Sequence, residues 1–240
     1  MATGIQRLGH VALTAPDPEA AADFAAARLG LRRVEGTRLA ALAGVDAFSL
    51  EYVTADGHAA FVTPGRDEEL RTPRGHVIRL IDGPSTDLPV GHLAAVPDRA
   101  PAPLCADHVG IVADDLDAEA AFFTGTLGML ESASVTGARR FLRFPRRYLH
   151  HQVVITRDEP YVQLTCKNLD SFYASAEALR DLIEWGPRRH GPGHEVAFAV
   201  KDLAGNRIVY SVEQEIVLDD DHHVPRTWNA DDPKVTDEWA

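Results

Sequence analysis

An internal repeat constrains the fold of this chain more than any other feature. A segment that begins at His10 recurs ninety-eight positions later at His108, and the two copies align without a gap for about 22 residues, of which about nine are identical. Each copy has the pattern of a short strand, an acidic residue and an alanine-rich helix that ends at a glycine, Gly30 or Gly128. A capping carboxylate and a closing glycine are typical of the two ends of a helix. The repeat therefore predicts two domains that share one design.

A second repeat marks the end of each half. A glycine turn followed by an alternating strand occurs at 74–81 and again at 204–211. The stretch from Gly83 to Pro103 is rich in proline and aspartate and is typical of a linker. Helical spacing of apolar residues predicts a further helix from Leu169 to Trp185. The expected divisions are an N-terminal domain, a C-terminal domain and an acidic, solvated tail, over residues 1–100, 101–217 and 218–240.

Composition narrows the class of protein. The chain has 240 residues and a formal net charge of -12, so phosphate backbones of nucleic acids would repel it. Only two cysteines occur, Cys105 and Cys166, which excludes a disulfide scaffold and a cysteine-rich zinc site. No apolar run is long enough for a membrane span, and the first ten residues lack the apolar core of a secretory signal. We therefore expect a cytoplasmic protein without nucleic-acid or membrane partners.

Taken together, these motifs resemble the vicinal oxygen chelate superfamily, whose domains consist of repeated βαβββ units. The segments that carry the resemblance are spread over most of the chain: GHVALTAPD, LAGVDAFSLEYV, ADHVGIV, PRRHGPGHEVAFAVKDLAGNRI and HHVPRTW. Their order is most similar to the two-domain extradiol ring-cleaving dioxygenases of the catechol 2,3-dioxygenase type. The resemblance implies an α+β fold with one curved mixed β-sheet in each domain. The second unit lacks room for its helix between Thr63 and Thr72, so a shortened version is expected.

The resemblance also implies a catalytic site in the C-terminal domain. Members of that family hold Fe(II) or Mn(II) with two histidines and one carboxylate, which leaves positions open for catecholate and O₂. Matched residue by residue, the first metal histidine falls on His108, the acid–base histidine on His151 and an assisting histidine on His190. The second metal histidine falls on Tyr161 and the metal carboxylate on Val209. Because valine has no ligand atom, we expect no metal in the usual site of this domain.

Six residues are the candidates for the C-terminal site. Strand alternation predicts that His151 faces the same cavity as His108, whereas His150 points to the surface. A neutral histidine is suited to proton exchange near pH 7. The expected catalytic residues are His151, His190 and Tyr161, and the expected substrate-binding residues are His108, His194 and Arg189.

The N-terminal half offers a rival metal site. His10, Asp46 and His58 would make a formal set of two histidines and one carboxylate. Arg79 stands at the fourth equivalent position, where it would repel a cation. The same segments also resemble the family's non-catalytic N-terminal domain, which binds no metal.

Three functions are compatible with this pattern. The first is an extradiol-dioxygenase-like enzyme with an altered or lost metal site, which oxygenates, cleaves, isomerises or cyclises an aromatic or polyketide-like phenolic compound. The second is a metal-free protein that binds and sequesters an aromatic small molecule. The third is a non-catalytic subunit that supports a dioxygenase. We expect a small aromatic or phenolic partner and a homo-oligomer.

Overall fold

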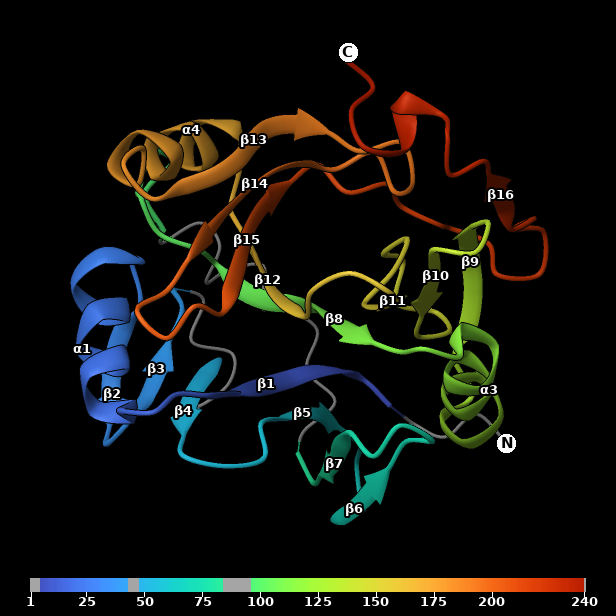
Figure 1. The fold of residues 1–240 in the computed structure, drawn as a ribbon, viewed down its shortest axis with the longest axis horizontal. Coiled ribbons are helices and arrows are strands. Elements are labelled where there is room, and N and C mark those ends of the chain that lie inside the picture. The colour runs from blue at the N-terminus through green and yellow to red at the C-terminus, as the bar shows by residue number, and fades with distance from the viewer. Residues whose placement is uncertain (1–4, 43–47, 84–95, 240) are drawn as a thin grey trace.

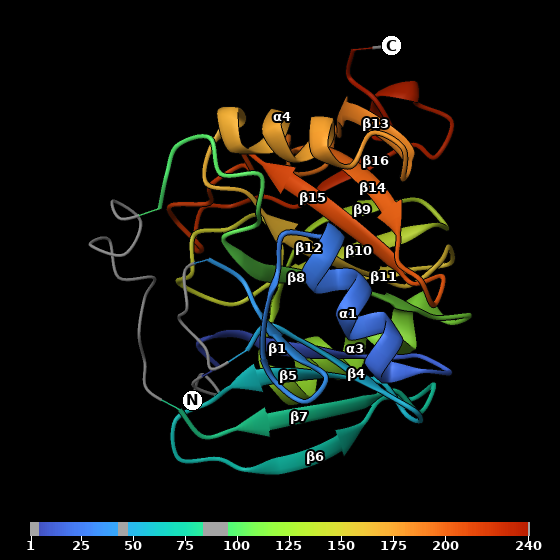
Figure 2. The same ribbon diagram turned by 90° about the vertical axis from the view of Figure 1, so that its left-hand side faces the viewer.

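Two β-sheets organise the chain, of which the computed structural model describes residues 5–42, 48–83 and 96–239 (Figure 1). Strands β1 to β7 form one sheet and strands β8 to β16 form the other. Figure 2 shows the seven-stranded sheet below and the nine-stranded sheet above. In the described part of the chain, no helix is long and apolar enough to cross a membrane.

The first sheet has the strand order β2-β3-β4-β1-β5-β7-β6. It is mixed, because β1 pairs in parallel with β4 and antiparallel with β5. Along the chain, the short strand β6 follows β5 directly where a full unit would have a helix, so this unit is shortened as the spacing of the sequence predicts. The elements of this half are β1 (Arg7–Thr14), α1 (Pro18–Arg28), β2 (Arg32–Glu35), β3 (Arg38–Ala40), β4 (Leu50–Val53), β5 (His58–Val62), β6 (Glu68–Arg71) and β7 (Val77–Ile81).

The second sheet has the strand order β13-β14-β15-β12-β8-β11-β10-β9-β16 and is also mixed. It curves, so that its two ends lie on opposite sides of one concave face (Figure 1). The elements of this half are β8 (Cys105–Val112), α3 (Leu116–Leu127), β9 (Leu130–Val135), β10 (Arg139–Arg143), β11 (Val153–Thr156), β12 (Tyr161–Thr165), α4 (Leu169–Ala178), β13 (Ile183–Arg189), β14 (Val196–Lys201), β15 (Arg207–Val212), β16 (Arg226–Trp228) and the 3₁₀ turn η1 (Pro233–Val235).

The repeated helices α1 and α3 begin as the repeat predicts. Asp17 accepts a hydrogen bond from the amide of Ala20, and Asp115 accepts hydrogen bonds from two amides of the first turn of α3. These bonds satisfy amides that have no partner within a helix. α3 ends at Gly128, whose φ of 67° is in the left-handed region that favours glycine.

One hydrophobic core joins the two halves. The rings of Phe61 on β5 and Phe144 after β10 meet edge to face, with centroids 5.4 Å apart. The buried hydroxyl of Tyr210 on β15 donates a 2.6 Å hydrogen bond to the carbonyl of Leu29 at the end of α1. The concave face of the second sheet is thus supported from behind by the first half of the chain.

The acidic tail is not the solvated extension that we expected. β16 pairs in parallel with β9 at the end of the sheet, and Trp228 is only 4% exposed. Asp220 accepts hydrogen bonds from the buried Arg143 side chain and from the amide of Arg146. The sequence does not predict β16, because a strand of three residues is too short to show a periodic pattern. The tail also reaches the concave face, where Val235 of η1 is buried.

Candidate active site

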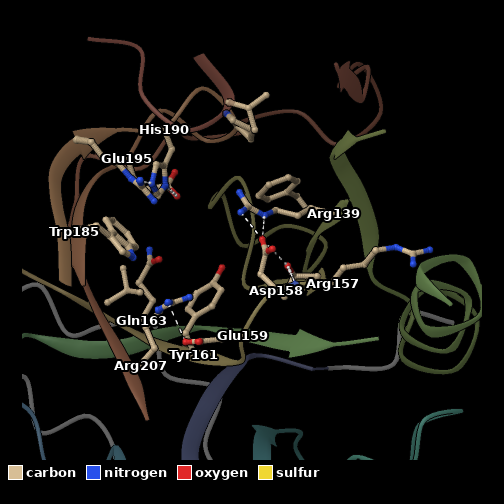
Figure 3. Close-up of a pocket in the computed structure, with 16 residues that line it drawn as sticks. Arg139, Arg157, Asp158, Glu159, Tyr161, Gln163, Trp185, His190, Glu195 and Arg207 are labelled. Atoms are coloured by element: carbon tan, nitrogen blue, oxygen red, sulfur yellow. Dashed lines mark hydrogen bonds and ion pairs between the residues drawn. The ribbon is translucent and has the colours of Figure 1, made fainter. Parts of the chain in front are cut away.

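A cavity of about 680 Å³ lies on the concave face of the nine-stranded sheet (Figure 3). Its walls come from β10, β11, β12, β13 and β15, and Val235 of the tail contributes from one side. Phe141, Tyr161 and Trp185 provide aromatic surface. A concave site of this size with a few polar groups among aromatic walls is typical of binding sites for small molecules.

The polar centre of the cavity is the pair formed by Glu195 and His190. His190 is the first residue of the loop between β13 and β14, and Glu195 is the last. His190 Nδ1 donates to Glu195 Oε1 over 3.3 Å, and Glu195 is 3% exposed. The other oxygen, Oε2, has no hydrogen-bond partner among the described residues. Burial by itself would raise the pKa of Glu195. The hydrogen bond from His190 and the electrostatic attraction of the His190 and His108 rings outweigh burial and hold that pKa below its usual value, so the carboxylate is ionised near pH 7.

Arg188 fixes the tautomer of His190. Its Nε donates to His190 Nε2 over 3.1 Å, and a guanidinium can only donate. Nε2 is therefore an acceptor, and the ring proton is on Nδ1, facing Glu195. In this arrangement the carboxylate orients the imidazole, and the far nitrogen can accept a proton.

His151 lies behind Glu195 and does not line the cavity. It is 1% exposed, its Nε2 is 3.8 Å from Glu195 Oε1, and its ring centroid is 4.4 Å from that of His108. Burial, and then the charges of His108 and His150, lower its pKa well below the usual value, so the ring is neutral. His151 thus lies beside His108, but it does not face the cavity as expected, because Glu195 is next to it on the cavity side.

The expectation that His150 points to the surface is wrong. His150 is 4% exposed, and its Nδ1 is 2.9 Å from His151 Nδ1. The alternation argument fails because β11 begins only at Val153, so both histidines belong to the preceding loop, where side chains do not alternate. His150 is therefore part of a buried cluster of hydrogen-bonded side chains that also contains His151, Gln214 and His108.

His108 is completely buried on β8. Its Nε2 is 2.9 Å from Gln214 Nε2 and 3.4 Å from Gln163 Nε2. Its Nδ1 is 2.9 Å from a carboxylate oxygen of Asp107. Because an amide nitrogen only donates, the Nε2 lone pair of His108 is engaged as an acceptor, and the ring proton is on the side of Asp107.

These residues do not fit the divalent metal that the family resemblance implies. Two amide N–H groups point at His108 Nε2, where a cation would need a lone pair. Across the sheet from His108 stands Gln163, and its neighbour on β15 is Val209, which has no ligand atom. Within 5–42, 48–83 and 96–239, no group of three histidine, cysteine, aspartate or glutamate side chains is arranged to hold a metal ion.

Tyr161 enters the cavity because the residue beneath it is a glycine. Gly110 faces Tyr161 across the β8–β12 pairing, and a Cβ atom at Gly110 would collide with the tyrosine ring. Figure 3 shows the hydroxyl pointing into the cavity. Burial raises the pKa of Tyr161, so it is a neutral phenol that can donate a hydrogen bond.

His194 and Arg189, two further predicted residues, do not line this cavity. His194 Nδ1 is 2.9 Å from Glu238 Oε2, and Arg189 Nη2 is 2.7 Å from Glu213 Oε2. Successive residues of a strand face opposite sides, so the cavity receives Arg188 of β13 and Arg189 faces away from it. His194 thus contacts the tail through Glu238, and Arg189 pairs with Glu213 just after β15.

The rival N-terminal site brings together two of its three predicted ligands. His10 Nε2 and His58 Nε2 are 3.3 Å apart, whereas Asp46 lies outside the described residues. Burial, then the charges of His58, Arg38 and Arg79, lower the pKa of His10 to about 4. The positive charges that disfavour a protonated His10 also disfavour a metal cation at this position.

Sequence reasoning did not single out Glu195, Gln163 or Gln214. Glu195 could have been noticed as a carboxylate directly before six consecutive strand residues, in a loop with two glycines. Gln214 carries no such signal. It reaches His108 because the residue before it has a φ of 61°, which turns the chain after β15.

Comparison with solved structures identifies the fold. The Mn(II)-bound glyoxalase from Novosphingobium aromaticivorans matches with a TM-score of 0.83 at 20% identity, over 98% of this chain and 91% of that chain. The homoprotocatechuate 2,3-dioxygenase from Arthrobacter globiformis matches with a TM-score of 0.82 at 16% identity, over 99% of this chain and 88% of that chain. The chain has the vicinal oxygen chelate fold. This confirms the fold that the sequence motifs predict.

A third structure with the vicinal oxygen chelate fold is equally similar. An extradiol ring-cleaving dioxygenase from B. fuscum matches with a TM-score of 0.81 at 16% identity, over 99% of this chain and 80% of that chain. No protein-family model and no curated protein matches the chain. Because one fold supports many activities, the function has to be argued from the site.

Proposed function

We propose that the chain is an enzyme that moves protons on an aromatic or polyketide-like phenolic compound, without a divalent metal at His108. The observation that carries this proposal is the buried Glu195–His190 pair at the wall of a cavity with aromatic sides. Burying an ionised carboxylate with one unpartnered oxygen is costly, and such costs are concentrated at functional sites. Isomerisation or cyclisation is the reaction class that this pair supports.

In the proposed reaction, His190 Nε2 takes a proton from a substrate hydroxyl or from a carbon next to a carbonyl. Glu195 accepts the Nδ1 hydrogen bond throughout and stabilises the imidazolium that forms. The Tyr161 hydroxyl donates to the substrate oxygen on which negative charge develops. The proton then returns to another atom of the same molecule, so that no oxidant or reductant is needed.

The size of the cavity supports a substrate larger than a single ring. Its volume of about 680 Å³ falls within the range of sites for drug-sized molecules. Phe141, Tyr161 and Trp185 offer flat faces against which fused rings can pack. His151 contributes in this proposal as a positioning residue, because it contacts Glu195 from the side away from the cavity.

The test is exchange of solvent deuterium into a panel of hydroxylated tetralones, followed by proton NMR in heavy water. We expect exchange by the unaltered chain after chelator treatment, and a rate lower by about 10²- to 10⁴-fold in Glu195→Gln, the usual effect of losing acid–base catalysis. Glu213→Gln is the matched control, since Glu213 pairs with Arg189 away from the cavity.

Two outcomes would overturn the proposal. One is exchange that requires added Fe(II) or Mn(II), and the other is exchange that is as fast in Glu195→Gln as in the unaltered chain. Binding of the panel compounds without exchange would favour the alternative function, sequestration of an aromatic molecule by the same aromatic walls.

A further inference from the structure

Arg188 stands out among the arginines that line the cavity. Arg139 is paired with Asp158 over 2.6 Å, and Arg207 is paired with Glu184 over 2.8 Å. Arg157 is exposed to solvent, whereas Arg188 is half-buried. In the part of the chain that the structure describes, no carboxylate oxygen is within ion-pair distance of Arg188. Its contacts are the Nε hydrogen bond to His190 and the face of Trp185, whose ring centroid is 3.8 Å from the guanidinium carbon.

The charge of Arg188 is partly removed from water without being neutralised. Burial, and then the nearby charge of Arg139, lower its pKa below the usual value, and the carboxylate of Asp237, beyond ion-pair distance, opposes them only in part. A desolvated guanidinium is normally paired with an anion in proteins. The two terminal nitrogens, Nη1 and Nη2, have no hydrogen-bond partner among the described residues, so one edge of the group is left to pair with a ligand.

We propose that Arg188 binds a carboxylate on the substrate, and that this carboxylate draws the guanidinium away from His190 Nε2. The proposal rests on the proposed function of His190 and names the substrate class for the same site. The planar guanidinium fork matches a carboxylate with two parallel hydrogen bonds, and the Trp185 face holds the fork in one plane.

In this arrangement, the availability of His190 as a base depends on whether a carboxylate ligand is bound to Arg188. Without an anion, the Nε hydrogen of Arg188 occupies the lone pair that His190 would use to accept a proton. A substrate carboxylate supplies a better acceptor for the guanidinium and frees that lone pair. A neutral compound of the same shape leaves Arg188 on His190, so it reacts more slowly, because it meets a free lone pair only when that hydrogen bond opens. The site therefore selects phenolic carboxylic acids over their neutral analogues.

The experiment compares a hydroxynaphthoic acid with the corresponding hydroxynaphthamide, which has the same rings and no charge. Dissociation constants are measured by titration calorimetry with the full chain at pH 7.5. We expect the acid to bind at least tenfold more tightly than the amide, and Arg188→Gln to reduce that ratio to within twofold. Arg188→Lys should recover only part of the preference, because an ammonium group does not form the planar fork.

Arg180→Gln is the control variant. Arg180 is exposed and does not line the cavity, so its loss removes one positive charge without touching the site. It should keep the tenfold preference. Thermal unfolding of each variant shows whether it is folded. Arg188 is only half-buried, so the fold should tolerate its substitution.

An acid that binds no more tightly than the amide to the unaltered chain would overturn the inference, and so would binding of neither compound. A preference that survives in Arg188→Gln would overturn it as well. These results are separate from the proposed function, because deuterium exchange into neutral tetralones that depends on Glu195 would still support proton transfer by His190. Conversely, a tenfold preference for the acid without any exchange would leave Arg188 as the anion-binding group of a sequestering protein.

Discussion

Glu195→Gln changes a charge and almost nothing else, so it tests the physical basis of the site. The amide oxygen of glutamine can still accept the hydrogen bond from His190 Nδ1, so the ring keeps its orientation. What is lost is the difference between a charge-assisted and a neutral hydrogen bond, which is about 1–2 kcal/mol. We therefore expect the free energy of unfolding at pH 7 to fall by about that amount, measured by urea denaturation.

The pH dependence of this loss follows from the direction of the pKa shift. Because the pKa of Glu195 is lowered in the folded protein, its ionisation stabilises the fold above the unfolded pKa near 4.5. That contribution disappears as the pH falls through the folded pKa. The stability difference between the unaltered chain and Glu195→Gln should therefore be full at pH 7 and shrink below about pH 4.5. A variant that is more stable than the unaltered chain at pH 7 would refute the view that His190 stabilises the charge.

Four further substitutions test other parts of the structure. Gly110→Ala should lower the free energy of unfolding by about 1–3 kcal/mol in urea denaturation, because its Cβ would collide with the Tyr161 ring. Gly125→Ala, in a helix with open space around it, should instead stabilise by up to about 1 kcal/mol. His150→Ala should cost about 1–3 kcal/mol in the same assay, since it removes one of the two hydrogen-bond partners of the buried His151 Nδ1, and no loss would mean that the pair is not formed. Trp228→Ala should cost about 3–5 kcal/mol and speed hydrogen exchange in β9, whereas unchanged exchange would show that β16 does not hold that edge.

The sequence predicts the fold well where the signal is local chemistry. The capping carboxylates and the closing glycine of α3 act on the nearest turn of chain, so they can be recognised without knowing the rest of the structure. The repeated strand before each helix then fixes which segments correspond. These local signals are enough to identify two copies of one unit, and the solved structures confirm the fold.

Element boundaries are predicted less well, because two periods can agree over a few residues. The helix expected to reach Trp185 ends at Ala178, and Ile183 already belongs to β13. Leu179 and Ile183 continue the helical spacing by chance, since both pack inward from different elements.

Site residues on strands are likewise easier to predict from the sequence than site residues in loops. His108 and Tyr161 are on strands, and their places follow from the motif and the register. Glu195 and Gln214 reach the cluster through turns whose geometry depends on the finished fold. No pattern along the sequence indicates that Gln214 would occupy the lone pair of His108.

The pairing of β16 with β9 also protects the protein from association with other chains. β9 would otherwise be the last strand of the nine-stranded sheet, with a row of unpaired amide and carbonyl groups along its free side. Such an edge is a template for adding a strand from another molecule, which is a common route to aggregation. The strand that covers it lies in a tail whose carboxylates resist association by charge repulsion. Proteolytic cleavage between Val217 and Arg226 would release that cover, so the clipped protein should form intermolecular β-sheet faster than the intact chain.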